Sequence, residues 1–513
     1  MSTTDNDMPG PGVAVADPGS GAAADGSFLG HPRGLSVLFF TEMWERFSYY
    51  GMRASLVLYM TRATVDANPG LGYDVATAGA IYGLYTSLVY LTTIAGGWIA
   101  DNMWGQRRAV FTGGCIIAAG HFSMAVPATP MFFLGLMLIV VGTGLLKPNV
   151  STIVGDLYPE GGARRDAGFS IFYMGINTGA FLGPILCGLF GENYNWHWGF
   201  SLAGFGMLIG LVQFKMGEKH FGDIGAYEGD SNAATLAARS RLVYGLAAAT
   251  AAAALVAGWL IATGAWTPDL PAIGGTLGYA IIVLAILYFA WLLVLGGHTA
   301  IEKKRLLVIF WLFILAAMFW SGFEQAGSSM NLFAEGLTDR VVFGWEAPAS
   351  WLQSINAIFI ILLAPVFGSL WVWLASRNAN PSIPMKFALG LLGLAAGVFV
   401  LAWGAANATP ESPVSPAWLI VTYFLHTVGE LCLSPVGLSS ITKLAPRNRL
   451  GQMMGVWFVA AALGNLFAGL AAGQLESMDS ASLFGQVAMI IGGAGMVALL
   501  ASPVVRKLSG RVD

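Results

Sequence analysis

Residues 41 to 60 read TEMWERFSYYGMRASLVLYM and combine the apolar length of a bilayer-crossing helix with two glutamates and two arginines. The rest of the chain is also apolar: of its 513 residues, 56% are hydrophobic and only 10% are charged, whereas soluble domains carry about 25% charged residues. Its 67 glycines suit helices that pack closely in lipid. The composition therefore predicts an integral membrane protein.

The charged side chains of this stretch share one helix face. At 100° per residue, five polar side chains fall within an arc of about 100°: Glu42, Glu45, Arg46, Tyr49 and Arg53. A charge turned toward lipid costs roughly 2.5–3.5 kcal/mol, so we expect this face to point into protein or water. Three interpretations of these charges remain open: a structural cluster of ion pairs, end residues that extend to the headgroups, and a functional site. Charges in the middle of other helices favour the functional site.

Hydropathy predicts fourteen membrane-spanning helices, because the chain contains fourteen apolar runs of roughly 20 residues or more. They cover residues 36–60, 76–100, 108–126, 131–155, 167–190, 198–216, 241–264, 273–297, 306–334, 348–375, 385–406, 414–443, 450–474 and 482–505. Most Lys and Arg residues fall in loops on one side, and only Arg62 and Arg340 fall on the other. An excess of cations marks the cytoplasmic side, so both termini are predicted to be cytoplasmic, in a cell (inner) membrane.

Fourteen spans divide into two bundles of six if the alanine-rich seventh span and the eighth form an inserted hairpin. Transporters are often built from two such halves, with the substrate site between them. We predict an all-α protein with four parts: a disordered cytoplasmic tail (1–33), an N-terminal six-helix bundle (34–220), a linker with the inserted helix pair (221–304), and a C-terminal six-helix bundle with its tail (305–513).

Composition and motifs exclude several other classes of protein. The net charge of −3 gives no basic surface for nucleic acid. Cys115, Cys187 and Cys432 lie in apolar runs and are too few for a disulfide framework or a metal cluster. The sequence contains no HExxH, GxSxG or GxxxxGKS motif. We therefore expect neither an enzyme nor ATP coupling, no metal and no cofactor, and an ion gradient that supplies the work.

Three further charges lie in the middle of predicted helices: Lys147, Glu324 and Glu430. Together with the four charges of the first helix they make four acids and three bases, so one acid lacks a partner. An unpaired buried carboxylate takes up a proton rather than remain charged in a low-dielectric site. The hypothesis that follows is a cavity with one exchangeable proton, although a water-filled cavity would keep all seven groups ionised.

Several segments, in register from residue 36 to 506, carry a resemblance to a known family. They are EMWERFSYYG (42–51), GLLKPN (144–149), FYMGINTG (172–179), FEQ (323–325), GELCLSPVG (429–437) and the loop motif Gly97-x-x-Ala100-Asp101-x-x-x-Gly105-x-x-Arg108. Together they resemble the proton-dependent oligopeptide transporter family of the major facilitator superfamily, whose bacterial members have the extra helix pair. The resemblance implies a symporter that imports di- and tripeptides with protons by alternating access. Its partners would be di- and tripeptides, protons and membrane lipids.

A zwitterionic peptide needs a cation for its carboxylate and an anion for its ammonium. Arg53 and Lys147 are the candidates for the carboxylate, since Arg grips it through two parallel hydrogen bonds and Lys supplies a movable point charge. Glu430 is the candidate for the ammonium, assisted by Asn177 and Asn356. For either Asn the alternative is a hydrogen bond between helices.

Four aromatic residues are expected to line the cavity, with apolar faces and polar tips for varied side chains: Tyr49, Tyr50, Tyr90 and Trp457. The alternative is ordinary packing or an interfacial aromatic belt. Two histidines in spans, His121 and His426, are interpreted as packing residues. Gly83 occupies the position at which animal members of the family carry a histidine, so proton handling must depend on carboxylates.

The resemblance also assigns proton coupling and gating. Five residues would couple protons to transport: Glu42, Glu45, Arg46, Lys147 and Glu430. Lys147 would pair with a deprotonated carboxylate of the first helix until protonation releases it. Arg53 and Glu324 would pair as an outer gate when the cavity faces inward, and Asp101 and Arg108 would act on the cytoplasmic side. A charge pair that forms in one conformation and breaks in another shifts the equilibrium between the two conformations by the difference in its energy.

Two alternatives to peptide import remain. Plant relatives in this family move nitrate and other small solutes, so the same fold is compatible with a nitrate-like or drug-like cargo. The two glutamates of the first helix and the acid at position 430 argue for peptides, because nitrate has no ammonium to bind. The second alternative is a membrane enzyme or receptor that uses a buried polar cavity.

Overall fold

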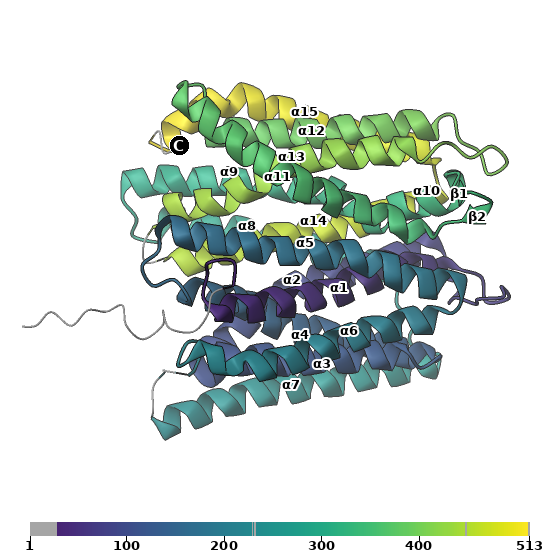
Figure 1. The fold of residues 1–513 in the computed structure, drawn as a ribbon, viewed down its shortest axis with the longest axis horizontal. Helices are drawn as coiled ribbons and strands as arrows, with labels where there is room; N and C mark the ends of the chain where they lie inside the picture. The colour runs from purple at the N-terminus through teal and green to yellow at the C-terminus, as the bar shows by residue number, and fades with distance from the viewer. Residues whose placement is uncertain (1–27, 228, 230–231, 447–448, 511–513) are drawn as a thin grey trace, which may run out of the picture.

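The computed structural model describes residues 28–227, 229, 232–446 and 449–510, and it consists mainly of long helices that run side by side (Figure 1). The first part contains α1 (Arg33–Thr61), α2 (Val75–Ile99), the π-helix η1 (Ala100–Trp104), α3 (Gln106–Met124), α4 (Thr129–Asp156), α5 (Gly162–Asn193), α6 (Trp196–Gly217) and the 3-10 turn η2 (Glu218–Phe221). The middle part contains α7 (Ala233–Ala262) and α8 (Leu270–Val294). The last part contains α9 (Ala300–Phe323), η3 (Glu324–Gly327), α10 (Ser329–Leu337), β1 (Val341–Val342), β2 (Trp345–Glu346), η4 (Ala349–Gln353), α11 (Ser354–Ser376), α12 (Ile383–Ala405), α13 (Ala417–Leu444), α14 (Leu450–Ala472), η6 (Gly473–Glu476) and α15 (Ser480–Leu508).

The predicted spans all fall on helices of the described residues. Twelve helical segments are long and apolar enough to cross a membrane, and α1 and α3 bring the number of long helices to fourteen. Helix α1 falls outside the twelve because its charges interrupt the apolar run. Most of the predicted tail, 1–33, lies outside the described residues; within it, Phe28 and His31 form a bridge and Arg33 already begins α1.

Short polar side chains begin several helices at the loops. Asp479 accepts a hydrogen bond from the amide of Ser482 at 2.8 Å, and this amide holds the pKa of the Asp479 carboxyl below its ordinary value. Thr299 and Glu302 form a capping box at the start of α9. Such caps satisfy amide groups that have no partner within the helix.

One predicted span is interrupted. The run 306–334 was predicted as a single helix, but α9 ends at Phe323 and is followed by η3 and α10. The break is stabilised by side chains: the Ser328 hydroxyl donates to the carbonyl of Ala468 on α14 at 3.1 Å, and the Ser329 hydroxyl donates to Gln325 at 2.8 Å. Serine side chains that bond to backbone groups compete with helix geometry, so the chain bends where Glu324 enters the interior.

The long helices form two bundles with an insertion between them. Helices α1 to α6 pack with one another, and α9 and α11 to α15 pack with one another. The bundles meet where α2 packs on α14 and where α5 packs on α11. This is the arrangement of the major facilitator fold, as predicted.

The two inserted helices take different positions. Helix α8 packs against α2, α9 and α14. Helix α7 has no buried residue and contacts η1. Arg239 of α7 donates a hydrogen bond to the backbone carbonyl of Asn102 in η1. Figure 1 shows α7 at one edge of the molecule. The predicted hairpin is therefore two helices that pack on different neighbours, because α7 offers mostly alanine and small side chains for packing.

Glycines allow α2 and α14 to approach closely. A Cβ built on Gly469 would lie 2.4 Å from the carbonyl oxygen of Gly79 and 2.5 Å from the backbone of Gly83. We expect Gly469→Val to lower the free energy of unfolding by about 1–3 kcal/mol, the usual cost of overpacking, in an SDS titration followed by tryptophan fluorescence. Gly493→Val is the matched control, since a Cβ at Gly493 meets no atom within 4 Å; equal stability of the two variants would contradict the expectation.

Candidate functional site

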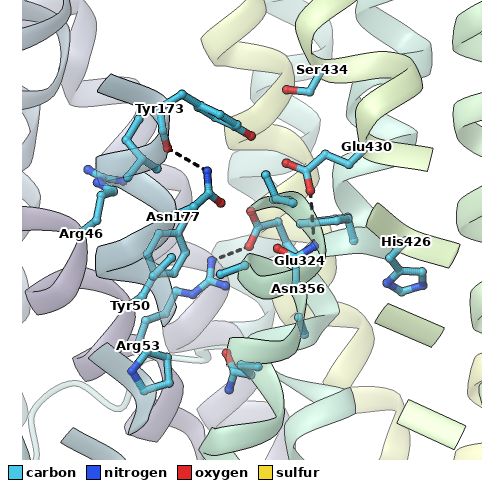
Figure 2. Close-up of a pocket in the computed structure, with 18 of the residues that line it drawn as sticks. Arg46, Tyr50, Arg53, Tyr173, Asn177, Glu324, Asn356, His426, Glu430 and Ser434 are labelled. Carbon is cyan, nitrogen blue, oxygen red and sulfur yellow. Dashed lines mark hydrogen bonds and ion pairs between the residues drawn. The ribbon is translucent and has the colours of Figure 1, made fainter. Parts of the chain in front are cut away.

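A polar cavity of about 290 Å³ lies between the two bundles. Its lining comes from α1, α2, α4 and α5 on one side and from α9, η3, η4, α11 and α13 on the other. Figure 2 shows charged and amide side chains from both bundles pointing toward one another across it. Ten of the predicted binding, coupling and gating residues line this cavity: Glu42, Arg46, Tyr50, Arg53, Tyr90, Lys147 and Asn177 from the N-terminal bundle, and Glu324, Asn356 and Glu430 from the C-terminal bundle.

The charged face of α1 is turned into the protein. Glu42, Glu45, Arg46 and Arg53 are all buried, as the cost of exposing charges to lipid requires. The Arg46 guanidinium forms ion pairs with both glutamates, and its distance to Glu42 is 3.2 Å. One guanidinium therefore holds two carboxylates. Its carbon also lies 5.1 Å from the centre of the Tyr49 ring, which adds a cation–π contact.

The cavity-facing stripe of α1 is shifted from the predicted one. Glu42, Arg46, Tyr50 and Arg53 line the cavity, whereas Glu45 and Tyr49 do not. Glu45 is fully buried behind Arg46, and the Tyr49 ring stacks on Tyr85 of α2 at 6.5 Å. Positions 45 and 49 lie at the same edge of the helical arc, and Tyr49 at this edge contacts the neighbouring helix α2. Tyr50, on the other side of the arc, lines the cavity.

An ion pair joins the two bundles at Arg53. Its guanidinium nitrogen lies 2.5 Å from Glu324 Oε2, and the two side chains are 7% and 6% exposed. Glu324 begins η3 and so reaches α1 from the interruption between α9 and α10. Figure 2 shows this pair crossing the cavity below Asn177. The pair predicted from family resemblance as an outer gate is thus formed in this conformation.

Lys147 enters the cavity from α4. Its Nζ lies 3.9 Å from the centre of the Tyr90 ring, and the part of the chain described here gives it no ion pair within 4 Å. Tyr90 also belongs to the lining. The Lys147 ammonium therefore rests on an aromatic face and shares the cavity with Glu42, the carboxylate nearest the cavity on α1.

The opposite wall carries a carboxylate and an amide. Asn356 Nδ2 donates to Thr427 Oγ1 at 2.9 Å and to Glu430 Oε2 at 3.4 Å, which orients the Glu430 carboxylate on α13. Asn177 Nδ2 instead donates to the carbonyl of Tyr173 in its own helix at 2.9 Å. Figure 2 shows Arg46 and Arg53 on one side of the cavity and Glu430 on the other. Glu42 and Lys147 also line the cavity, from α1 and α4.

Besides Glu45 and Tyr49, three more predicted residues lie outside the cavity lining. Trp457 is 7% exposed, and its ring lies 6.4 Å from that of Phe387 within the C-terminal bundle, so it packs instead of lining the cavity. Asp101 accepts a hydrogen bond from Gln106 at 3.1 Å. The Arg108 guanidinium lies 5.4 Å from the Trp104 ring. Among the described residues no ion pair joins Asp101 and Arg108 in this conformation.

The two histidines differ in position. His121 is fully buried away from the cavity, whereas His426 contributes to the lining and its ring lies 6.0 Å from that of Phe323. His426 also lies against Gly397 of α12. Both are buried among packed helices, as the packing interpretation expects.

The lining includes residues that the sequence analysis missed: Tyr173, Trp320, Gln353, Tyr423 and Ser434. A signal existed for Tyr173, which lies in the FYMGINTG segment four residues before Asn177 and therefore on the same helix face. Gln353 comes from η4, whose position depends on the tertiary fold and leaves no periodic pattern.

The bundles are joined at the end where α1 and α5 end. The Glu192 carboxylate on α5 accepts the amides of Ala349 and Ser350 at 2.7 and 3.1 Å. Arg62, at the end of α1, forms an ion pair with Glu335 of α10. These contacts close the cavity at the end near Arg53, and they were not visible in the sequence because each connects segments far apart in the chain.

Two six-helix bundles with a polar cavity between them define a solute transporter of the major facilitator type. The POT family model matches residues 107–490 of this chain. The peptide transporter YePEPT of Yersinia enterocolitica subsp. palearctica is 42% identical over 498 residues, which cover 94% of this chain and 96% of that protein. A di-/tripeptide transporter of Lactococcus lactis subsp. cremoris is 39% identical over 441 residues, which cover 85% and 88%.

A solved structure supports the same assignment. The crystal structure of a mutant peptide transporter POT in complex with alafosfalin matches with a TM-score of 0.83 at 42% identity, covering 94% of this chain and 97% of that one. This chain belongs to the POT family, and it is a multi-pass membrane protein.

Proposed function

We propose that this protein is a proton-coupled symporter that imports di- and tripeptides by alternating access. The observation that carries the proposal is one cavity in which Arg53 and Lys147 lie beside Glu42 on one wall and the Glu430 carboxylate lies on the other. This polarity suits a zwitterion, whose carboxylate and ammonium would face opposite walls. The relatives from Yersinia enterocolitica and Lactococcus lactis, a peptide transporter and a di-/tripeptide transporter, support the same substrate class.

The proposed topology puts both termini in the cytoplasm of a cell whose inner membrane the protein crosses. Residues 34–220 and 305–513 would be the two transport bundles, and 221–304 the linker with the inserted helices. The cargo moves without chemical change, so the proposed protein is not an enzyme. It needs no cofactor, metal or nucleic acid, because the proton gradient drives it.

The proposed proton site is the cluster that Arg46 holds together. Glu42 and Glu45 share this guanidinium, so protonation of one carboxylate leaves the other paired. Lys147 and Glu430 complete the coupling set from the same cavity. A proton taken up by the α1 carboxylates changes the field at Lys147 and thereby its attraction for a peptide carboxylate.

The proposed gates alternate between the two membrane faces. The Arg53–Glu324 pair and the contacts of Glu192 close the outer end in this conformation, so the cavity is assigned to an inward-facing state. Asp101 and Arg108 would form their cytoplasmic contact in the outward-facing state, in which the outer pair must break.

The test of the proposed function is uptake of dialanine into proteoliposomes. Dialanine should accumulate against its gradient when the interior is alkaline, and it should only equilibrate when the pH is equal on both sides. Accumulation of nitrate but not dialanine would favour the same fold with another cargo. Chemical conversion or signalling without accumulation of any solute would favour a membrane enzyme or receptor.

Glu430 gives a specific prediction. Glu430→Gln should raise the KM for dialanine at least about tenfold, because a hydrogen bond to a charged group contributes about 1.5–3 kcal/mol. For N-acetyl-dialanine, which has no ammonium, the same substitution should change the KM by less than about twofold, well below the value of such a bond. Ser434→Ala, on the same helix and the same cavity, is the control. A similar loss for both substrates would show that Glu430 does not bind the ammonium.

A further inference from the structure

The chain segment that leads to the inserted helices contacts the loop between α2 and α3. This loop, residues 100–108, consists of η1 and the first turn of α3. A Cβ built on Gly105 of the loop would lie 2.6 Å from the amide nitrogen of Tyr227. A Cβ built on Gly225 would lie 3.2 Å from Ile153 Cγ1 of α4. Residues 222–227 therefore pack on both the loop and α4, and we call them the strap.

The strap and α7 bond to backbone groups at the ends of two helices. The first amides and the last carbonyls of a helix have no partner inside that helix. At the start of α3, the amide of Arg107 donates to the carbonyl of Gly225 at 3.0 Å. In η1, the carbonyl of Asn102 accepts the Tyr227 hydroxyl at 3.0 Å and the Arg239 guanidinium of α7 at 3.2 Å. The strap and α7 thus hold the α2–α3 loop at both of these helix ends.

The loop held in this way carries Asp101 and Arg108, the residues assigned above to the cytoplasmic gate. Both side chains are exposed, so the strap fixes the backbone around them and leaves the side chains free to reach the other bundle. The strap contacts described above are with elements of the N-terminal bundle, so they persist when the two bundles move as rigid bodies. A loop that is already ordered loses less conformational entropy when it forms a gate contact.

We propose that the strap positions the α2–α3 loop for the cytoplasmic gate, and that Tyr227 and Arg239 are positioning residues of the transport cycle. This inference rests on the proposed function, since it assumes alternating access with a gate at Asp101 and Arg108. A loop released from the strap has to be ordered each time the cytoplasmic end closes. The outward-facing state then becomes less populated, and the apparent affinity for external peptide falls in proportion to that population.

The test is counterflow in proteoliposomes with the protein inserted in one orientation, which measures the external KM and the internal half-saturation concentration for dialanine separately. Tyr227→Phe removes only the hydroxyl and should raise the external KM about fivefold, a typical effect of one lost hydrogen bond. The internal value should stay within about twofold of wild type, because the inward-facing state does not use this gate. Arg239→Gln should act in the same direction. Arg239→Lys, which can still donate to the Asn102 carbonyl, should restore most of the external affinity.

A control and a second measurement separate positioning from a general structural effect. Arg241→Gln, at an exposed position two residues further along α7, should leave both values unchanged. Hydrogen exchange in a peptide that covers residues 100–108 should be faster in Tyr227→Phe than in wild type, because the loop loses a tertiary hydrogen bond. Unchanged exchange in this peptide would overturn the proposal. Faster exchange with a lower maximum rate and an unchanged external KM would also overturn it, since the strap would then be only structural. Wild-type protein that exchanges no dialanine would instead contradict the proposed function.

Discussion

Lys147→Ala should reduce the accumulation of dialanine to the equilibrium level, so that the internal and external concentrations become equal. The side chain of Lys147 is half-buried, and its ammonium lies on the Tyr90 ring in the cavity. The same cavity contains Glu42, whose partner Arg46 also holds Glu45. Without Lys147 the cavity keeps Glu42, with Glu45 behind Arg46, but loses the cation that the charge state of these carboxylates would control. Protonation of α1 then no longer changes the affinity for the peptide carboxylate, and the coupling free energy disappears.

The measurement is the ratio of internal to external dialanine at steady state, with an alkaline interior. Tyr90→Phe is the matched control, because it keeps the aromatic face under the ammonium and removes only the hydroxyl. We expect the control to accumulate dialanine within about twofold of wild type, since the cation–π contact is retained. The unfolding midpoints of both variants must match wild type. Concentrative uptake by Lys147→Ala would remove Lys147 from the coupling mechanism.

The sequence predicts the helices of this protein well because a bilayer of fixed thickness sets their length. The charged face of α1 is also predictable, since only burial avoids the cost of charges in lipid. The helical period places Glu42, Glu45, Arg46 and Arg53 on one arc. It does not say which neighbouring helix meets each edge of that arc, so Tyr49 and Tyr50 were both expected in the cavity, although only Tyr50 lines it.

The features that could not be predicted depend on contacts between distant segments. The break after Phe323 requires the bond from Ser328 to the carbonyl of Ala468, which is 140 residues away. The Glu192 cap on Ala349 is likewise a tertiary contact. Trp457 lies on an apolar helix in either interpretation, so its sequence context does not distinguish the cavity from the bundle core. Hydropathy also cannot say whether α7 packs on α8.

Glu324→Gln should reduce dialanine uptake about 100-fold or more by opening the outer end of the cavity. The Arg53–Glu324 pair is almost fully buried, with a separation of 2.5 Å. Removing one partner of a buried ion pair leaves an uncompensated charge and costs about 3–5 kcal/mol. The cost falls on the conformation in which the pair is formed, so the population shifts to outward-facing states in which it is already broken.

Opening can be measured directly with a cysteine at position 350. Ser350 is fully buried next to Glu192 in this conformation, so Ser350→Cys, in a background without the native cysteines, should react slowly with a membrane-impermeant maleimide. Adding Glu324→Gln should raise the rate of maleimide labelling at least about tenfold. A tenfold change corresponds to about 1.4 kcal/mol in the equilibrium between closed and open outer ends. Glu335→Gln is the matched control at the same end, because its partner Arg62 is 38% exposed and an exposed pair contributes about 0–1 kcal/mol.

The double variant Arg53→Gln/Glu324→Gln separates gating from peptide binding. Replacing both charges removes the uncompensated guanidinium, and neutral replacement of a buried pair is often close to neutral in energy. The maleimide rate at position 350 should therefore return toward the wild-type rate. Uptake should stay low, because Arg53 also belongs to the proposed carboxylate site. A double variant as open as Glu324→Gln alone would mean that the closed outer end requires the charge pair itself, whereas unchanged labelling in Glu324→Gln would show that this pair does not control the outer gate.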